Sequence, residues 1–238
     1  MKFAGGLLLL VASAAAAQSP GDAEIPPVNF PALPSHASSP AGFVSKGWKV
    51  EARATGDLNR DGRADAALVL HMADPRNLVP KDWDADQKYD SNPRMLVVLL
   101  ASPGGGYQLA AADHRIIPRL ENQNQEEPFD KIEIANGALK LKLHLFMDAG
   151  GWRMGDASFT LRWDGEAMRL IGYDADWTHR GTGETEEISV NYLTGRKLLK
   201  TGSIEDDALK ASTSSMPKKP APTLDQIGDG LMFDPGEQ

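Results

Sequence analysis

Hydrophobic and polar residues alternate with a period of two along much of the chain, which is the pattern of half-buried β-strands. The alternation is clearest over residues 139–145, where four leucines are separated by two lysines and a histidine. Asn136-Gly137 lies just before this segment and is a strong hairpin signal, with 132–134 as the preceding strand. We therefore expect an antiparallel hairpin whose leucine face points inward.

Two further pairs of alternating segments flank short turns that contain glycine. These pairs are 159–163 with 168–171, and 188–192 with 197–199. Residues 66–70 and 95–100 are instead continuous apolar runs, typical of buried strands, and we expect 95–100 to be covered on both faces. Long helical periodicity is absent.

About nine or ten short strands at hairpin spacing predict a mainly β fold. An antiparallel sandwich or a rolled meander of short strands fits this pattern best, with a partial β-propeller-like arrangement as the alternative. The predicted organisation is a signal peptide at 1–17, a Pro/Ser-rich lead-in at 18–45, a β-domain at 46–202 and a flexible C-terminal tail at 203–238. Within that tail four apolar residues could dock on the domain, namely Leu224, Ile227, Leu231 and Phe233.

The N-terminal segment has one positive charge, a short apolar core and the small residues Ala15-Ala16-Ala17, as secretory signal peptides do. The apolar core is too short to span a membrane comfortably. We expect cleavage after Ala17 and a periplasmic or secreted protein without membrane insertion after cleavage.

Composition narrows the possible chemistry. The chain has no cysteine, which rules out thiol nucleophiles, zinc–thiolate sites and iron–sulfur clusters. Its net charge of −8 disfavours binding to nucleic acid or to anionic membranes. No nucleophile elbow, P-loop or dinucleotide fingerprint is present.

The segment 55–65, TGDLNRDGRAD, carries the most specific chemical signal in the chain. Its potential cation ligands lie at positions 1, 3, 5, 7 and 9 of a loop, the seventh through a backbone carbonyl: Asp57, Asn59, Asp61, Arg63 and Asp65. Oxygen ligands at this spacing suit calcium, and Gly62 at position 6 permits a sharp turn. Leu68 replaces the closing glutamate of an EF-hand, and the flanks read as strands rather than helices.

This D-x-N-x-D-G-x-x-D loop between strands resembles the calcium loops of FG-GAP and VCBS-type repeats, but only one copy is found. The resemblance implies a structural calcium ion. An Asp/Asn/Gly-rich turn without a metal is the alternative. Further segments, including N92-P-R-M-L and N191-Y-L-T-G, give residues 46–200 a looser similarity to an uncharacterised group of secreted bacterial β proteins, which implies one domain and no particular chemistry.

Two other polar regions suggest sites. Four aspartates between residues 82 and 90 could form a second cation loop, although a solvated acidic loop is the simpler interpretation. A candidate ligand surface combines two tryptophans with charged neighbours in polar loops: Trp152, Arg153, Trp177, His179, Arg180 and Glu184. Ordinary connecting loops would also account for these residues.

We therefore expect an exported calcium-binding β protein with a binding or interaction role in the cell envelope, its partner an envelope protein or a glycan. The first alternative is a hydrolase of envelope glycans or peptides, which would need a carboxylate of perturbed pKa in a cleft beside the tryptophans. A third possibility places the interaction surface on flexible tails.

Overall fold

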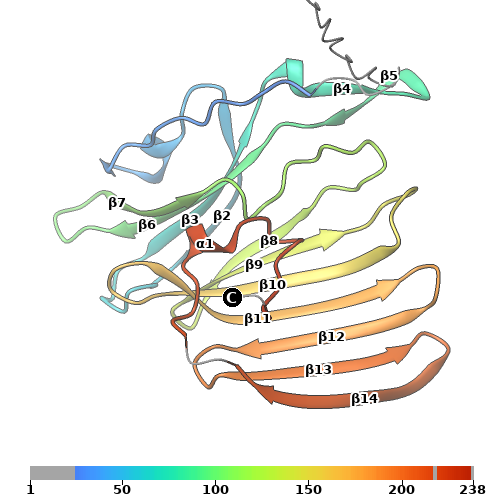
Figure 1. Cartoon of the computed structure of the whole chain (residues 1–238). Helices are drawn as coiled ribbons and strands as arrows, with labels where there is room; N and C mark the ends of the chain where they lie inside the picture. Colours follow the sequence, from blue (N-terminus) through green and yellow to red (C-terminus); the bar gives the residue numbers. More distant parts are fainter. Residues whose placement is uncertain (1–24, 217–218, 237–238) are drawn as a thin grey trace, which may run out of the picture.

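The computed structural model describes residues 25–216 and 219–236, so the predicted signal peptide lies outside the described residues. The chain folds as two packed antiparallel sheets that do not close into a barrel, with a small additional hairpin (Figure 1). The prediction of a mainly β, antiparallel sandwich is confirmed.

The smaller sheet has the strand order β1-β7-β6-β3-β2. Its strands are β1 (His36–Ala37), β2 (Trp48–Gly56), β3 (Asp65–Met72), β6 (Arg94–Ala101) and β7 (Tyr107–Asp113), with the 3-10 helix η1 (Pro40–Phe43) after β1. β3 and β6 lie at its centre and are buried on both faces, as the continuous apolar runs predict.

The larger sheet contains seven strands in strict chain order, so it is a meander. Its strands are β8 (Phe129–Ala135), β9 (Ala138–Leu145), β10 (Arg153–Trp163), β11 (Met168–His179), β12 (Glu184–Asn191), β13 (Arg196–Ser203) and β14 (Asp206–Ser215). The remaining elements are η2 (Pro75–Asn77), β4 (Leu78–Lys81), β5 (Asp84–Asp90) and α1 (Leu224–Ile227).

The turn between β8 and β9 forms as its sequence predicts. Asn136 and Gly137 have φ angles of 53° and 72°, and Ala135 pairs directly with Ala138. Positive φ at both central residues matches the twist of a two-residue hairpin, which is why Asn-Gly is favoured there.

One apolar core lies between the two sheets, and it joins Val69 and Val98 of the smaller sheet to Leu141 and Phe159 of the larger one. A second cluster covers the opposite face of the smaller sheet. The segment expected to be an extended lead-in supplies part of that cover, because Phe43 is fully buried and Phe30 packs there beside Trp48. The second apolar face of β3 and β6 needs this cover, which is why the lead-in belongs to the domain.

The C-terminal part also differs from the predicted flexible tail. Residues 206–215 form the edge strand β14, and the segment beyond them crosses over β10 and β11 (Figure 1). The four apolar residues that could dock do so: Leu224, Ile227, Leu231 and Phe233 are all buried in the main core. Phe233 packs on Phe159 and Tyr173, with ring centroids 5.6 and 5.1 Å away.

The aspartates between residues 82 and 90 mostly belong to β5, which pairs with β4 in a hairpin. Local hydrogen bonds hold them: Asp84 accepts from the Asp86 amide at 3.0 Å, and Asp90 accepts from the Asn92 amide at 2.9 Å. The expected acidic loop is therefore largely a short hairpin.

Candidate functional site

The predicted metal loop joins β2 to β3. The Asp57 carboxylate accepts hydrogen bonds from the backbone amides of Asp61 at 3.1 Å and Gly62 at 2.8 Å. Gly62 has a φ of 83°, which a residue with a side chain adopts only under strain. The loop thus folds back on its first aspartate, as expected from the position of the glycine.

Asp61 lies at the centre of this loop. Its Oδ2 accepts from the Asn59 amide group at 2.7 Å and from the Arg63 guanidinium, and its Oδ1 accepts from the Arg63 backbone amide at 2.9 Å. Partial desolvation raises the pKa of Asp61, but these hydrogen bonds and the charge of Arg63 outweigh it, so the pKa is lowered. The carboxylate is therefore held in its charged form.

Asp65 closes the loop and is fully buried. One carboxylate oxygen accepts from the Leu58 amide at 2.7 Å, and the other accepts from the Ala101 amide at 2.8 Å. Asp65 therefore ties the loop to the end of β6.

The donor set of the loop suits a hard cation, since it offers three carboxylates, one carboxamide oxygen and one backbone carbonyl. Hydrogen bonds from backbone amides orient the three carboxylates. The Arg63 guanidinium forms an ion pair with Asp61. In residues 25–216 and 219–236, no group of three or more histidine or acidic side chains is arranged so that it could hold a metal ion.

A pocket of about 600 Å³ opens at one end of the larger sheet, where β10 to β14 begin or end. Four of the six predicted ligand residues line it: Arg153, Trp177, His179 and Glu184. Trp177 is on the face of β11 that carries Tyr173 and Ala175, so the pocket continues the inner face of the sheet beyond the apolar core. Figure 1 shows β12, β13 and β14 extending past the smaller sheet.

The other two predicted residues lie beside the pocket. Trp152 is 65% exposed and stacks on His179, with ring centroids 5.9 Å apart and an angle of 7° between the planes. Arg180 instead turns away, because its guanidinium donates to the Met147 carbonyl and lies over the Phe146 ring.

Arg153 and Trp177 form the centre of the pocket wall. The guanidinium carbon lies 3.8 Å from the indole centroid, which is a close cation–π contact. Gly155 pairs directly with Trp177 across the strands, and a Cβ at Gly155 would come within 1.9 Å of the Asp176 carbonyl oxygen and 3.1 Å of the indole. A side chain at Gly155 would therefore clash with the backbone of β11, and the close pairing of β10 with β11 beside Trp177 requires a glycine there.

The turn between β11 and β12 links His179 to Glu184 through Thr182. The Thr182 amide donates to His179 Nδ1 at 3.1 Å, and the Thr182 hydroxyl donates to Glu184 Oε2 at 2.9 Å. Because Nδ1 accepts, the neutral imidazole carries its proton on Nε2. The turn fixes both side chains at the pocket rim.

The remaining polar lining comes from strands that sequence reasoning had not connected to this site. It includes Glu186, Thr201, Asp206 and Lys210, of which the last two lie in the predicted tail. Alternation along residues 184–190 could have indicated that Glu186 lies on the same face of a strand as Glu184. No sequence pattern indicated the strand β14. The side chains of Arg153, Glu186 and Lys210 form no ion pair within 4.0 Å with any side chain that the structure describes.

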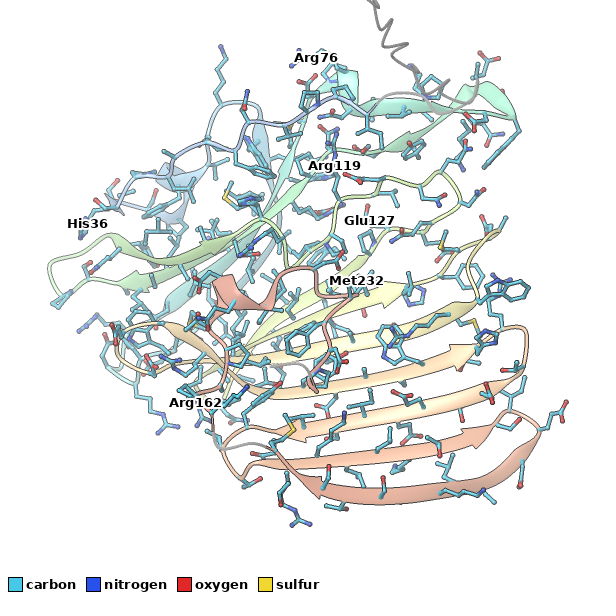
Figure 2. The ribbon with its side chains drawn as sticks, in the orientation of Figure 1. His36, Arg76, Arg119, Glu127, Arg162 and Met232 are labelled. Carbon is cyan, nitrogen blue, oxygen red and sulfur yellow. The ribbon has the colours of Figure 1, made fainter. Side chains whose placement is uncertain are left out.

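A buried charge cluster was also missed. Arg94, 2% exposed, donates to both oxygens of Glu51 at 2.5 and 2.8 Å. Its Nη1 lies 2.7 Å from Glu127, with the geometry of an ion pair rather than an aligned hydrogen bond. His71 pairs with Arg94 across the strands, and burial and the Arg94 charge lower its pKa. Figure 2 labels Glu127 in the segment that leads into the larger sheet.

Three carboxyl groups among the described residues have a raised pKa, and none of them lines the pocket. Burial raises the pKa of Glu127, Asp176 and Asp229. Asp176 precedes Trp177 in β11 and therefore faces the opposite side of the sheet. None of the three lines the pocket beside Trp177.

No family model, curated protein or solved structure matches this chain. Within the residues that the structure describes, none of the helices is long and apolar enough to cross a membrane.

Proposed function

We propose that this protein is an exported binding protein of the cell envelope whose ligand site is the pocket around Arg153, Trp177, His179 and Glu184. One observation carries this proposal: residues from the five strands β10 to β14 gather charged and aromatic groups in an open pocket. Its volume of about 600 Å³ is in the range of small-ligand sites. Export rests on the N-terminal sequence pattern.

Binding is favoured over hydrolysis by the distribution of titratable groups. A glycosidase-type acid needs a raised pKa, and such carboxyl groups mark candidate active sites. Glu127, Asp176 and Asp229 have a raised pKa but do not line the pocket. The polar lining is suited to hold a ligand through hydrogen bonds and charge.

The calcium loop is the second part of the proposal. Backbone amides orient Asp57 and Asp61 toward the inside of the turn, and Asp65 ties the turn to the neighbouring strand. A bound calcium ion would supply positive charge among these carboxylates, and Arg63 would give up its contact with Asp61. The role proposed for the ion is structural, because the loop and the pocket share no residue.

Titration of the isotope-labelled protein with short envelope oligosaccharides and short peptides, followed by NMR, tests the binding function. We expect at least one probe to shift the resonances of Trp177 and His179. Arg153→Ala should weaken that binding at least tenfold. Arg196→Ala is the matched control, because Arg196 is exposed at the opposite end of β13. Binding that survives Arg153→Ala, or an absence of pocket shifts with every probe, would overturn the proposal.

A further inference from the structure

Three of the charged side chains that line the pocket form no hydrogen bond or ion pair with any side chain that the structure describes. Two cationic and three acidic side chains line it: Arg153, Lys210, Glu184, Glu186 and Asp206. Glu184 accepts from Thr182, and Asp206 accepts from the Ala208 amide at 2.9 Å. The side chains of Arg153, Glu186 and Lys210 have no hydrogen-bond partner among the residues that the structure describes. Their charge is available to a ligand.

Strand register fixes the order of these groups. Glu186 pairs directly with Trp177 on one side and with Thr201 on the other, and Lys210 pairs with Thr201. Arg153 covers the indole of Trp177. Arg153 of β10, Glu186 of β12 and Lys210 of β14 therefore place a cation, an anion and a second cation in order across the sheet. Strands lie about 4.8 Å apart, so Arg153 and Glu186 are separated by on the order of 5–10 Å.

This alternation excludes ligands with only one kind of charge. A purely anionic ligand would face three carboxylates, and a purely cationic one would face Arg153 and Lys210. A neutral sugar would desolvate several charges without pairing them, which is costly. A ligand with an anionic and a cationic group a few ångströms apart pairs with Arg153 and Glu186 simultaneously, and charge-assisted hydrogen bonds are the strong ones.

We infer that the pocket binds a small zwitterionic ligand of the peptide class, with its carboxylate on Arg153 and its protonated amine on Glu186. The inference rests on the proposed binding function and names its ligand class. Glu184 and Asp206 lie one row further toward the rim, across Ser203, and add negative potential on the amine side. The Trp177 indole is only 5% exposed and lies under the Arg153 guanidinium, so it holds that cation at the pocket wall.

Isothermal titration with four forms of one peptide tests this directly. The probes are trialanine, its N-acetyl form, its C-terminal amide and the doubly capped form, with the neutral N-acetylglucosamine trimer beside them. We expect trialanine to bind at least tenfold more tightly than either singly capped form. The doubly capped peptide and the neutral sugar should be the weakest.

Isosteric variants assign each charge to its residue. Arg153→Gln should abolish the difference between trialanine and its amide, and it should preserve the difference between trialanine and its N-acetyl form. Glu186→Gln should do the reverse. Glu187→Gln is the matched control, since Glu187 is the next residue on the opposite face and pairs with Lys200, and its variant should bind like wild type. Cooperative thermal unfolding with a midpoint within a few degrees of wild type establishes that each variant folds.

The outcomes separate the two proposals. Equal affinity for capped and uncapped peptides overturns the zwitterion inference. Binding of the neutral sugar at the pocket with none of trialanine also overturns it, while the binding function stands. If no probe shifts any pocket resonance or gives heat, both proposals fail.

Discussion

The two faces of strands β11 to β13 carry similar residues in different electrostatic states. On the outer face, Glu187 pairs with Lys200 at 2.6 Å, and Asp174 accepts from the Ser189 hydroxyl at 2.6 Å. On the inner face at the pocket, Glu186 is the next residue to Glu187 but has the uncharged Thr201 opposite it. On these strands Glu187 and Asp174 have partners on the outer face, whereas Glu186 at the pocket forms no ion pair with any side chain that the structure describes.

This difference teaches where to look for function in a sheet whose sequence gives no motif. An exposed ion pair contributes at most about 1 kcal/mol to stability, so the outer charges mainly keep that face soluble and in register. Unpaired charges inside a pocket contribute no such pairing energy to the fold. Further along the same face of β11 stand Tyr173 and Ala175, which belong to the core. The change from apolar to unpaired charged residues marks the boundary between core and candidate ligand site.

The largest expected effect comes from removing what closes the inner face next to the pocket. Phe233→Ala should lower the free energy of unfolding by about 3–5 kcal/mol, because it leaves a cavity against Phe159 and Tyr173. Met232→Ala is the control, since Met232 is 75% exposed (labelled in Figure 2) and should change stability by less than about 0.5 kcal/mol. Urea unfolding measures both.

If Phe233→Ala were as mild as its neighbour, the C-terminal segment would not close the core. The apolar and the open parts of the inner face would then no longer be distinct regions.

Calcium should act on the stability of the fold without altering either face of the larger sheet. A site that binds only the folded state adds about 2.7 kcal/mol at a hundredfold excess of ion over its dissociation constant. For a chain of this size that is a rise of about 5–10 °C in the unfolding midpoint. An Asp57→Ala/Asp61→Ala variant should lose the rise, as measured by calorimetry with calcium and with chelator.

Asp84→Ala/Asp86→Ala is the control for the loop, because it removes carboxylates from the other acidic segment, in β5. It should leave the calcium response intact. A wild-type protein that unfolds at the same temperature with calcium and with chelator would reduce the Asp57–Asp65 segment to a hydrogen-bonded turn.

Much of the fold could be predicted because its signals are local. Leucine alternation and Asn136-Gly137 specify the β8–β9 hairpin, and the apolar run at 95–100 specifies a strand buried on both faces. What covers that second face is a matter of long-range packing, so the role of Phe30 and Phe43 was not visible. The strand β14 has little apolar content and forms through pairing with β13, which local patterns do not report.

The candidate site was predicted in part for the same reason. Trp177, His179 and Glu184 are close in sequence, so a polar turn with an aromatic residue could be recognised. Arg153 joins them only because β10 pairs with β11 in a register that sets it opposite His179. Lys210 joins through two more strands. Contacts that depend on the register of several strands have no signature at a fixed sequence spacing.

The outer face offers a test through pH. Asp156 and Asp176 pair across β10 and β11. Burial raises the pKa of Asp156, but hydrogen bonds from Lys142 and His144 outweigh it, so the pKa is lowered. Burial, together with the charge of Asp156, raises the pKa of Asp176. Asp156 therefore stabilises the fold above the ordinary aspartate pKa, and this contribution is lost as pH falls through its lowered pKa.

The contribution of Asp176 to stability depends on pH in the opposite direction. Its ionisation costs stability as pH rises through the ordinary aspartate pKa towards its raised pKa. At pH 7, Asp156→Asn should lower the free energy of unfolding by about 0.5–1 kcal/mol, the scale of a screened pair, and Asp176→Asn should not lower it. In urea titrations the Asp176→Asn difference should disappear below the ordinary aspartate pKa, and the Asp156→Asn difference should disappear only once the pH is below the lowered pKa of Asp156. Equal losses for both variants at pH 7 would contradict the assigned signs.

The smallest expected effect separates the two faces most sharply. Glu187→Gln removes the pair with Lys200 on the outer face and should cost about 0.3–0.5 kcal/mol. Glu186→Gln removes a carboxylate with no cation beside it and should cost less than that or slightly stabilise the fold. The two residues are adjacent in one strand and undergo the same chemical change, so differences in β-propensity largely cancel. Urea unfolding at low salt measures the stability of both variants. At high salt the stability lost in Glu187→Gln should shrink, because the ion pair with Lys200 is screened.

If Glu186→Gln lost as much stability as Glu187→Gln, then Glu186 would have a structural partner, and its charge would not be free for a ligand. The expected result is a loss of stability on the outer face alone, with a loss of ligand binding on the inner face alone.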